Sequence, residues 1–255
     1  MINNRIIPVL LIKDGYLYKT VNFKNPIYIG DPVNTVKIFN EKEVDELIVL
    51  DIEASQKGNE PDYDIIFNIA SECFMPLTYG GGINSIEKAK MIFDIGIEKV
   101  VINSNIQNSD LISEITNRYG SQSVVASVDY KSNYFQTKII PYNYSGTKKF
   151  HDDFFSIIKQ SINAGAGELM IQSIDRDGTM SGYDIETLKK IRSEVNVPII
   201  ICGGAGKHSD FYDAKVNGAS GLAAGSLFIY KGVHKAILIN YPDQALVNNI
   251  LEGKI

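Results

Sequence analysis

Tryptophan is absent from this sequence of 255 residues, and cysteine and histidine are scarce, with two and three residues respectively. Cys73 and Cys202 lie far apart and form no CxxC pair, which favours buried apolar roles over redox or metal chemistry. The three histidines lack the mutual spacing that is typical of a metal site. We therefore expect no metal and no other cofactor.

Long hydrophobic runs are also missing, as is any excess of positive charge. No apolar stretch is long enough to span a bilayer, and the first 15 residues lack the small-residue cleavage site of a signal peptide. The net charge is −5 and the pI is about 5.3, which disfavours a nucleic-acid-binding protein. We expect a cytoplasmic protein that acts without a nucleic-acid or membrane partner.

What the sequence does contain is a regular alternation of short apolar runs with amphipathic stretches of helical spacing. The runs are RIIPVLL (5–11), LIVLDI (47–52), MPLTYG (75–80), KVVINS (99–104), VVASVD (124–129), ELMIQSI (168–174), VPIIICG (197–203) and GLAAGS (221–226). Near-continuous hydrophobic strands are typical of a parallel sheet that helices cover on both faces. Eight alternations in about 250 residues predict an α/β fold of the (β/α)8 TIM-barrel type. A doubly wound open sheet is the alternative.

An internal repeat strengthens the barrel prediction. The pairs Glu46 and Glu168, Gly82 and Gly204, and Ser104 and Ser226 are each separated by 122 positions. A doubled unit that closes into one barrel pairs its own edge strands. We therefore expect one domain over residues 1–255, built from two fused half-barrels of about 1–122 and 123–255.

Two glycine clusters follow the third and seventh predicted strands. Successive backbone N–H groups near glycine form a nest for an anion, and a nearby hydroxyl completes a phosphate site. Tight turns between strand and helix would need the same glycines. Because each cluster has a small polar partner one strand later, two phosphate sites are favoured. The residues concerned are Gly82, Asn103 and Ser104 in one, and Gly204 and Ser226 in the other, with the loop 175–184 beside the second.

Asp129 ends the fifth predicted strand, where a barrel places its catalytic residues. We expect it to act as an acid or base. Asp51, Asp175 and Asp177 also lie at strand ends or just beyond, and for them capping of a loop is an equally good interpretation.

The opposite ends of the strands carry a second set of charges, namely Arg5, Glu46, Lys99 and Glu168. In a barrel these positions form a ring around the axis, where two cations and two carboxylates neutralise each other. Both a structural plug and a gate fit this arrangement.

Taken together, these residues resemble the HisF family, the cyclase subunits of imidazole glycerol phosphate synthase. The specific stretches are RII…KDG (5–15), GDPV (30–33), DEL…LDI (45–52), GGGI (80–83), GAGE (165–168), SIDRDGT.SGYD (173–184) and GGAGK (203–207). The resemblance implies a barrel that receives ammonia from a separate HisH-like glutaminase. It also implies one phosphate site at Gly82, Asn103 and Ser104, and a second at Asp177, Gly178, Gly204 and Ser226. Asp129 matches a catalytic aspartate, Lys19 a lysine of a mobile loop, and Arg5, Glu46, Lys99 and Glu168 an ammonia gate.

One position departs from the family. Where the family carries a second catalytic aspartate, this chain has Leu11, which can neither donate nor accept a proton. The chain is most similar to the glycosyl-amidation-associated, WbuZ-like branch of the family. That similarity implies that ammonia passes to a separate sugar amidotransferase and ends in an acetamidino group on an amino sugar.

Three functions remain open at this point. The first, which Leu11 favours, is a HisF-like ammonia-handling subunit in amino-sugar amidation. The second is a cyclase that forms imidazole glycerol phosphate for histidine biosynthesis and acts on a phosphorylated small molecule through Asp129. The third is a barrel that only binds and activates its glutaminase.

Overall fold

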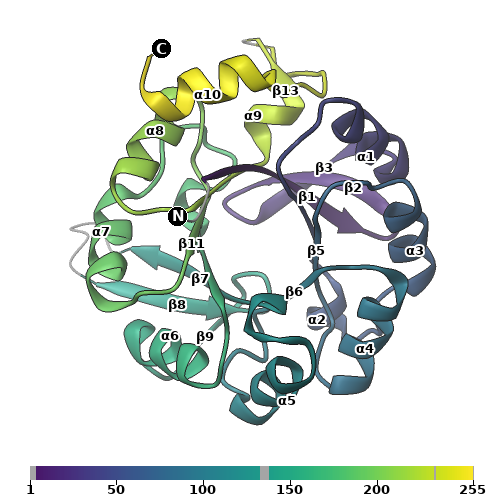
Figure 1. Ribbon diagram of the computed structural model, residues 1–255, viewed down its shortest axis with the longest axis vertical. Coiled ribbons are helices and arrows are strands. Elements are labelled where there is room, and N and C mark those ends of the chain that lie inside the picture. The colour runs from purple at the N-terminus through teal and green to yellow at the C-terminus, as the bar shows by residue number, and fades with distance from the viewer. Residues whose placement is uncertain (1–3, 133–137, 233, 255) are drawn as a thin grey trace.

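The computed structural model describes residues 4–132, 138–232 and 234–254. Within these residues eight parallel strands close into a barrel, because β10 pairs with β7 and completes the ring (Figure 1). The expected (β/α)8 barrel is thus confirmed. In order around the barrel, the strands are β1 (Arg5–Lys13), β4 (Leu47–Asp51), β5 (Leu77–Gly80), β6 (Lys99–Ile102), β7 (Val124–Ser132), β10 (Glu168–Ser173), β11 (Ile199–Cys202) and β12 (Gly221–Ala224).

Helices surround the barrel on its outer side (Figure 1). Asp31 and Asp184 cap two of them, accepting hydrogen bonds from the backbone N–H groups of Asn34 and Thr187. The helices are α1 (Pro32–Glu41), α2 (Ala54–Lys57), α3 (Tyr63–Ser71), α4 (Ile86–Ile95), α5 (Ser109–Tyr119), α6 (Phe154–Asn163), α7 (Ile185–Glu194), α8 (Ser209–Val216), α9 (Ser226–Ile229) and α10 (Gln244–Glu252), with 3-10 turns η1 (Ser121–Ser123) and η2 (Ile174–Arg176).

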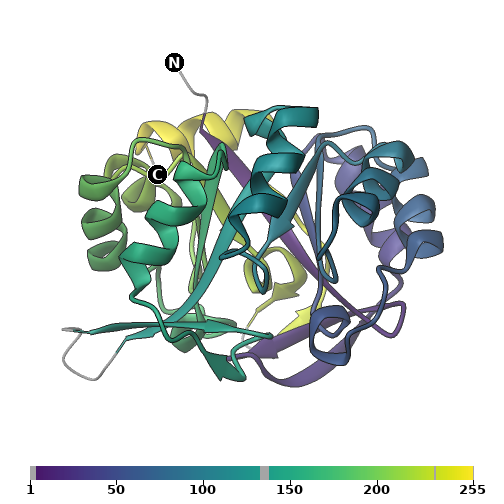
Figure 2. The ribbon, with the colours of Figure 1, turned by 90° about the horizontal axis from the view of Figure 1, so that it is seen from below.

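Two antiparallel hairpins extend the barrel at the end opposite the N-terminus (Figure 2). One consists of β2 (Tyr16–Val21) and β3 (Lys24–Gly30), and the other of β8 (Ile139–Asn143) and β9 (Lys148–Lys149). A third, short pair is β13 (Tyr230–Lys231) with β14 (Ala236–Ile237). The alternation of barrel strands and helices did not predict these hairpins. Lys19, expected on a loop, lies in β2 and is buried.

Strand β1 shows how the barrel interior is built. Alternate residues of a strand share a face, and on β1 the inward residues are Arg5, Ile7, Val9, Leu11 and Lys13. The middle three belong to an apolar cluster separate from the larger core between sheet and helices. The other buried members of this inner cluster are Ile48, Val101, Val125, Met170, Ile200, Cys202 and Ala223. The barrel is therefore apolar along its axis and charged at both ends.

The strand register relates positions in the two halves of the chain. Leu11 pairs with Leu50 and Asp129 pairs with Gln172, and Leu50 and Gln172 are separated by the same 122 positions as the repeat. Leu11 and Asp129 therefore occupy equivalent positions on β1 and β7. By the same register, Val9 is equivalent to Ser127.

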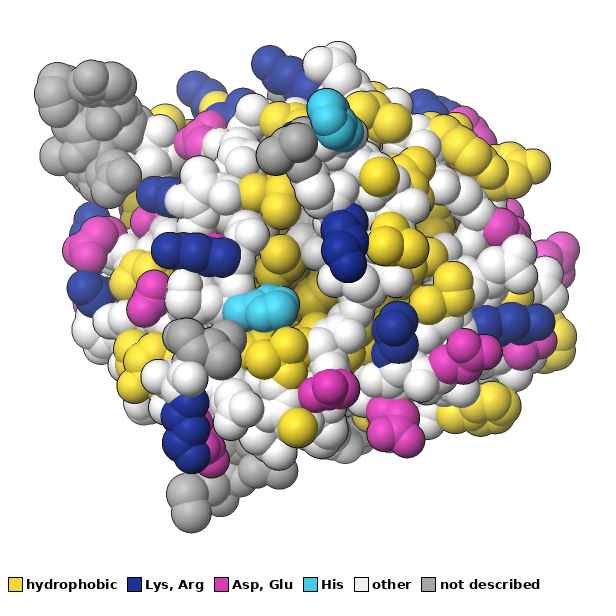
Figure 3. All heavy atoms as spheres, turned by 90° about the horizontal axis from the view of Figure 1, so that it is seen from above, with side chains coloured by type: hydrophobic (Ala, Val, Ile, Leu, Met, Phe, Trp, Pro, Cys, Tyr) yellow, Lys and Arg dark blue, Asp and Glu magenta, His cyan; other side chains and the backbone are white. Residues whose placement is uncertain are grey.

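The outer surface mixes side chains of different kinds. Figure 3 shows the side that carries α9 and α10, where hydrophobic side chains lie among charged side chains of both signs. Among the helices of the described residues, none is long and apolar enough to cross a membrane.

Candidate functional site

The carboxyl ends of the barrel strands surround two cavities, which together form the mouth. The first has a volume of about 320 Å³ and the second about 20 Å³. Leu11 and Gln172 line both cavities and therefore separate them. The structure brings every phosphate-site residue expected from the sequence to one of these two cavities.

The first cavity contains the first expected phosphate cradle. Gly82, Asn103 and Ser104 line it together with Asp129. Gly82 adopts a φ of +71°, which places its N–H toward Ser55, whose Oγ accepts that hydrogen bond at 3.2 Å. A hydroxyl thus lies where an anion oxygen would accept the same N–H.

The second cavity contains the second cradle. Gly178, Gly204 and Ser226 line it, and the loop after β10 contributes Asp177 and Met180. Gly204 has a φ of +111°, and a side chain there would overlap the carbonyl of Gly182. The close approach of these two loops explains why glycine occupies this position.

Lys19 reaches into the second cradle from the hairpin. Its Nζ donates a hydrogen bond to the carbonyl of Val9 at 2.8 Å, and the residue is only 6% exposed. Burial lowers the pKa of Lys19 to about 8, although the nearby Asp177 carboxylate acts in the opposite direction.

Asp129 is buried in the wall of the first cavity, beside Gln172, which lines both cavities. Burial, together with the charge of Asp177, raises its pKa to about 7, while a hydrogen bond from Asn103 acts to lower it. A carboxyl group with a pKa near neutrality can both hold and release a proton under ordinary conditions. Asp129 therefore has the properties of an acid–base group, as its position predicts.

Asp177 holds the hairpin against the mouth. Its Oδ2 accepts hydrogen bonds from Thr20 Oγ1 at 2.7 Å and from the N–H of Phe23 at 3.2 Å. Its pKa is raised, mainly because it is buried. Asp177 lines the second cavity, yet its carboxylate accepts hydrogen bonds from the hairpin.

The other two aspartates at strand ends act as caps. Asp51 accepts from the backbone N–H groups of Glu53 and Ala54, each at 2.9 Å, and begins α2. Asp175 accepts from the N–H of Ser132 at 2.9 Å. These contacts agree with the capping interpretation.

A charged group on the rim of the first cavity went unrecognised in the sequence. Glu53 lies between Lys13, at 2.7 Å, and Lys57, at 2.5 Å. Burial acts to raise the pKa of Glu53, but hydrogen bonds from the two lysines hold it below its ordinary value. The spacing of Glu53 and Lys57, four residues apart, is the one sequence signal for this cluster.

A turn between β8 and β9 crosses the mouth and was also missed. The carbonyl of Tyr144 accepts from Gln56 Nε2 at 3.0 Å, and Ser145 Oγ donates to the carbonyl of Ile52 at 2.7 Å. This turn from the second half therefore rests on the first half of the barrel.

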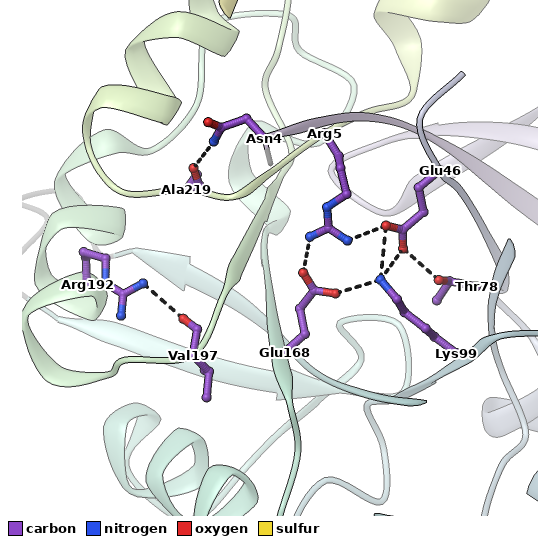
Figure 4. A network of polar contacts seen from close by, with 9 residues as sticks. All are labelled: Asn4, Arg5, Glu46, Thr78, Lys99, Glu168, Arg192, Val197 and Ala219. Carbon is purple, nitrogen blue, oxygen red and sulfur yellow. Dashed lines mark hydrogen bonds and ion pairs between the residues drawn. The ribbon is translucent and has the colours of Figure 1, made fainter. Parts of the chain in front are cut away.

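The opposite end of the barrel carries the expected ring of charges (Figure 4). Arg5 pairs with Glu46 at 2.5 Å and with Glu168, and Lys99 bridges the same carboxylates at 3.0 and 3.2 Å. Thr78, not expected from the sequence, donates to Glu46 Oε1 at 3.0 Å. Burial acts to lower the pKa of Arg5, but the two carboxylates raise it above its ordinary value.

The two ends are joined by the apolar interior. From Arg5 to Leu11 along β1 is six residues, or about 20 Å of extended strand. Such an interior penalises a charged molecule, which loses its hydration without compensation, far more than a neutral one. Among the residues that the structure describes, no group of three or more histidine, cysteine, aspartate or glutamate side chains is arranged to hold a metal ion.

Known proteins share this sequence over most of its length. Residues 5–235 match a family model described as "Histidine biosynthesis protein". The chain is 49% identical over 246 residues to the "Putative imidazole glycerol phosphate synthase subunit HisF" of Leptospira interrogans, covering 96% of this chain and 97% of that protein. It is 46% identical to the "Putative imidazole glycerol phosphate synthase subunit hisF2" of Pseudomonas aeruginosa, covering 95% and 97%. It is 38% identical to the "Imidazole glycerol phosphate synthase subunit HisF" of Limosilactobacillus fermentum, covering 91% and 89%.

Proposed function

This chain belongs to the family of histidine biosynthesis proteins that includes relatives of imidazole glycerol phosphate synthase subunit HisF, and we propose that it is the ammonia-using subunit of a two-protein synthase. One observation carries the proposal. The barrel has a charged ring at one end, an apolar interior, and at the other end two candidate anion cradles, with the buried Asp129 in the wall of the first. That combination suits a reaction in which a small neutral nucleophile arrives from below and a phosphorylated ligand waits above.

The ring Arg5, Glu46, Lys99 and Glu168 is proposed as the entrance for ammonia. The supplier is a HisH-like glutaminase that docks on this face of the barrel. Each charge in the ring has a partner of opposite sign, so the closed state is neutral and opening requires one ion pair to separate. Neutral ammonia then crosses the inner cluster at a lower cost in free energy than ammonium would.

At the mouth, Asp129 is proposed as the group that exchanges a proton with the ligand. Its pKa of about 7 keeps a substantial fraction in each protonation state near neutral pH. The first cradle binds a phosphate through the Gly82 N–H, with Asn103 and Ser104 beside it. The volume of about 320 Å³ leaves room for the rest of a small phosphorylated molecule.

The names of the relatives favour imidazole glycerol phosphate synthesis as the reaction. We therefore place the cyclase function first, contrary to the preference for amidation that Leu11 suggested in the sequence. In this function the ligand carries a phosphate at each end, the products are imidazole glycerol phosphate and an aminoimidazole carboxamide ribonucleotide, and the chain acts in the cytoplasm.

Amino-sugar amidation remains the second candidate, and one observation favours it. Leu11 occupies the position on β1 that is equivalent to Asp129 on β7, and it lines both cavities. The mouth therefore has no carboxyl group at the position facing Asp129 across the pseudo-symmetric barrel. In this function the barrel receives ammonia and a separate sugar amidotransferase uses it.

A cyclase assay with excess ammonium salt tests the proposal without the glutaminase. The purified chain is given the family's two-phosphate ribulosyl substrate, and formation of imidazole glycerol phosphate is followed. Turnover supports the cyclase, and binding without turnover supports amidation. Glutamine hydrolysis by the purified partner, measured with and without this chain, tests ammonia handling; no stimulation would contradict both candidates.

A further inference from the structure

The two cradles are related by the repeat, yet their cavities differ greatly in size. Positions 82 and 204, and 104 and 226, are separated by the same 122 residues, but the volumes are about 320 and 20 Å³. A volume of about 20 Å³ admits roughly one water molecule. A phosphate group has five heavy atoms, so it does not fit the second cradle in this conformation.

A single substitution between the halves explains the difference. In the first half, Asn103 Nδ2 donates to the carbonyl of Ser127 at 3.1 Å. In the second half, the equivalent of Asn103 is Gly225, and the equivalent of Ser127 is Val9. The carbonyl of Val9 is bound instead by Lys19 Nζ, at 2.8 Å. The long lysine side chain thus takes the place of the shorter amide and fills the cradle.

The contact with Lys19, and not the backbone conformation of residue 225, explains the glycine at this position. Its φ of −108° is accessible to any residue, so the turn itself does not require glycine. A side chain at Gly225 would, however, overlap Lys19 Nζ. The missing side chain therefore provides the space in which the ammonium group lies.

The hairpin that carries Lys19 is fastened over the cradle. Thr20 and Phe23 bind the carboxylate of Asp177, and the N–H of Asn22 donates to the Asp177 carbonyl at 3.0 Å. Asn22 Nδ2 also donates to the carbonyl of Asp175 at 2.7 Å. Lys19 Nζ itself has one of these hydrogen bonds, to the carbonyl of Val9, but lifting the whole hairpin would break several at once.

We propose that Lys19 is an internal occupant of the second cradle, which competes there with phosphate. The inference rests on the proposed function of the two cradles as phosphate sites. A ligand with one phosphate enters the first cradle while the hairpin stays closed. A ligand with two phosphates fills both only after the hairpin lifts Lys19 out. The resting protein therefore selects ligands by their number of phosphate groups.

Titration with inorganic phosphate, followed by calorimetry, tests the competition directly. The wild type and the control Lys24→Ala, on the exposed part of the same hairpin, are expected to bind one phosphate per chain. Lys19→Ala is expected to bind two. In the Lys19→Ala background, Ser226→Ala should weaken the gained site and Ser104→Ala the original one.

Removal of a lysine that binds phosphate would instead weaken phosphate binding. Unchanged or weaker phosphate binding by Lys19→Ala, or two sites in the wild type, would overturn the inference. A wild type that binds no phosphate would contradict the proposed first cradle instead. In that case the inference about Lys19 still requires that Lys19→Ala bind one phosphate more per chain than the wild type.

A second measurement reports on the hairpin while Lys19 stays in place. Because the chain has no tryptophan, Tyr28→Trp on β3 introduces a single tryptophan whose fluorescence reports on the hairpin. Fructose 1,6-bisphosphate at saturation is expected to shift its emission, whereas ribose 5-phosphate is not. Equal responses to the two probes would overturn the inference even if the alanine variant failed to fold.

Discussion

On the first half of the mouth, Leu11 faces the cavity and pairs with Leu50; on the second half, Asp129 occupies the equivalent position and pairs with Gln172. The carbonyl of Val9 is bound by a lysine from a hairpin, and that of Ser127 by an asparagine that directly follows the neighbouring strand β6. From this register we propose that the chain is one domain made of two fused half-barrels. A repeated backbone can thus carry the proposed proton-transfer group in one half and the hairpin that covers the second cradle in the other.

The largest effect on this difference between the halves is expected from removing Asp129, the proposed acid–base group. Asp129→Asn keeps the shape of the side chain and cannot take up or release a proton. We expect ammonium-dependent turnover of the substrate to fall by about 100-fold to 10,000-fold. The control is Asp175→Asn, because that carboxylate caps a backbone N–H. A rate for Asp129→Asn within threefold of the control would contradict the role of Asp129.

The same variant tests the burial of Asp129 through the pH dependence of stability. The folded-state pKa of about 7 lies above the ordinary value of 3.8, so the folded protein holds this proton more tightly than the unfolded chain. The stability that proton binding at Asp129 gives to the folded protein is fully present below pH 3.8 and is lost as pH rises to about 7. We expect urea unfolding to show the wild type losing up to about 4 kcal/mol relative to Asp129→Asn across that range. A constant difference between pH 4 and pH 8 would contradict this prediction.

At the other end of the barrel, Glu46→Gln leaves Arg5 and Lys99 with Glu168 as their remaining carboxylate in the ring. Because Glu46 is 1% exposed, we expect a loss of about 3 kcal/mol in the free energy of unfolding. Glutamine-dependent activity should also fall more than ammonium-dependent activity, since only the former uses the gate. Glu72→Gln removes an exposed pair with Lys37 and should cost less than about 1 kcal/mol. Equal losses of the two activities would argue for a structural plug.

The difference between the two cradles is tested by placing at position 225 the asparagine that occupies the equivalent position 103. Gly225→Asn introduces a side chain where Lys19 Nζ lies, and we expect a loss of about 1–3 kcal/mol in the free energy of unfolding. In the double variant Gly225→Asn with Lys19→Ala, most of that loss should disappear. Thermal unfolding of the four proteins of this cycle measures the coupling. Additive effects of the two substitutions would contradict the contact.

The smallest expected effect concerns the fastening of the hairpin. Thr20→Val removes one hydrogen bond to Asp177 and should cost about 1 kcal/mol. Amide exchange in β2 and β3 should become faster, whereas exchange in β4 should not change. Val21→Thr, at an exposed position of the same hairpin, is the control. Unaltered exchange in the hairpin of Thr20→Val would show that this bond does not limit its opening.

Much of this architecture could be predicted from the sequence because its signals are local. The eight barrel strands appear as continuous apolar runs. Asp31 and Asp184, of a residue type preferred at N-caps, directly precede the helices that they cap. The phosphate-site residues and Asp129 could be placed at the mouth because each lies near or just beyond the carboxyl end of an apolar run. Asp51 shows the limit, since the same position fits a cap or a catalytic group.

The features that escaped prediction depend on contacts between distant segments. Lys19 is buried because Gly225, more than 200 positions later, leaves room for it, and no local pattern in β2 signals this. The turn at Tyr144 crosses the mouth to reach Gln56, which lies 88 positions away. The unequal volumes of the cradles follow from such contacts and not from the repeat, which predicts two sites without their sizes.

Strand β1 and its hairpin are one uninterrupted piece of chain, and this continuity bears on inheritance. Residues 5–30 contain the gate arginine, the apolar wall, the divider between the cavities and the lysine that fills the second cradle. Its partners, however, lie outside the segment: Arg5 pairs with Glu46 and Glu168, and Lys19 Nζ lies against Gly225. An inherited change within residues 5–30 therefore alters both ends of the barrel together and needs matching residues much later in the chain.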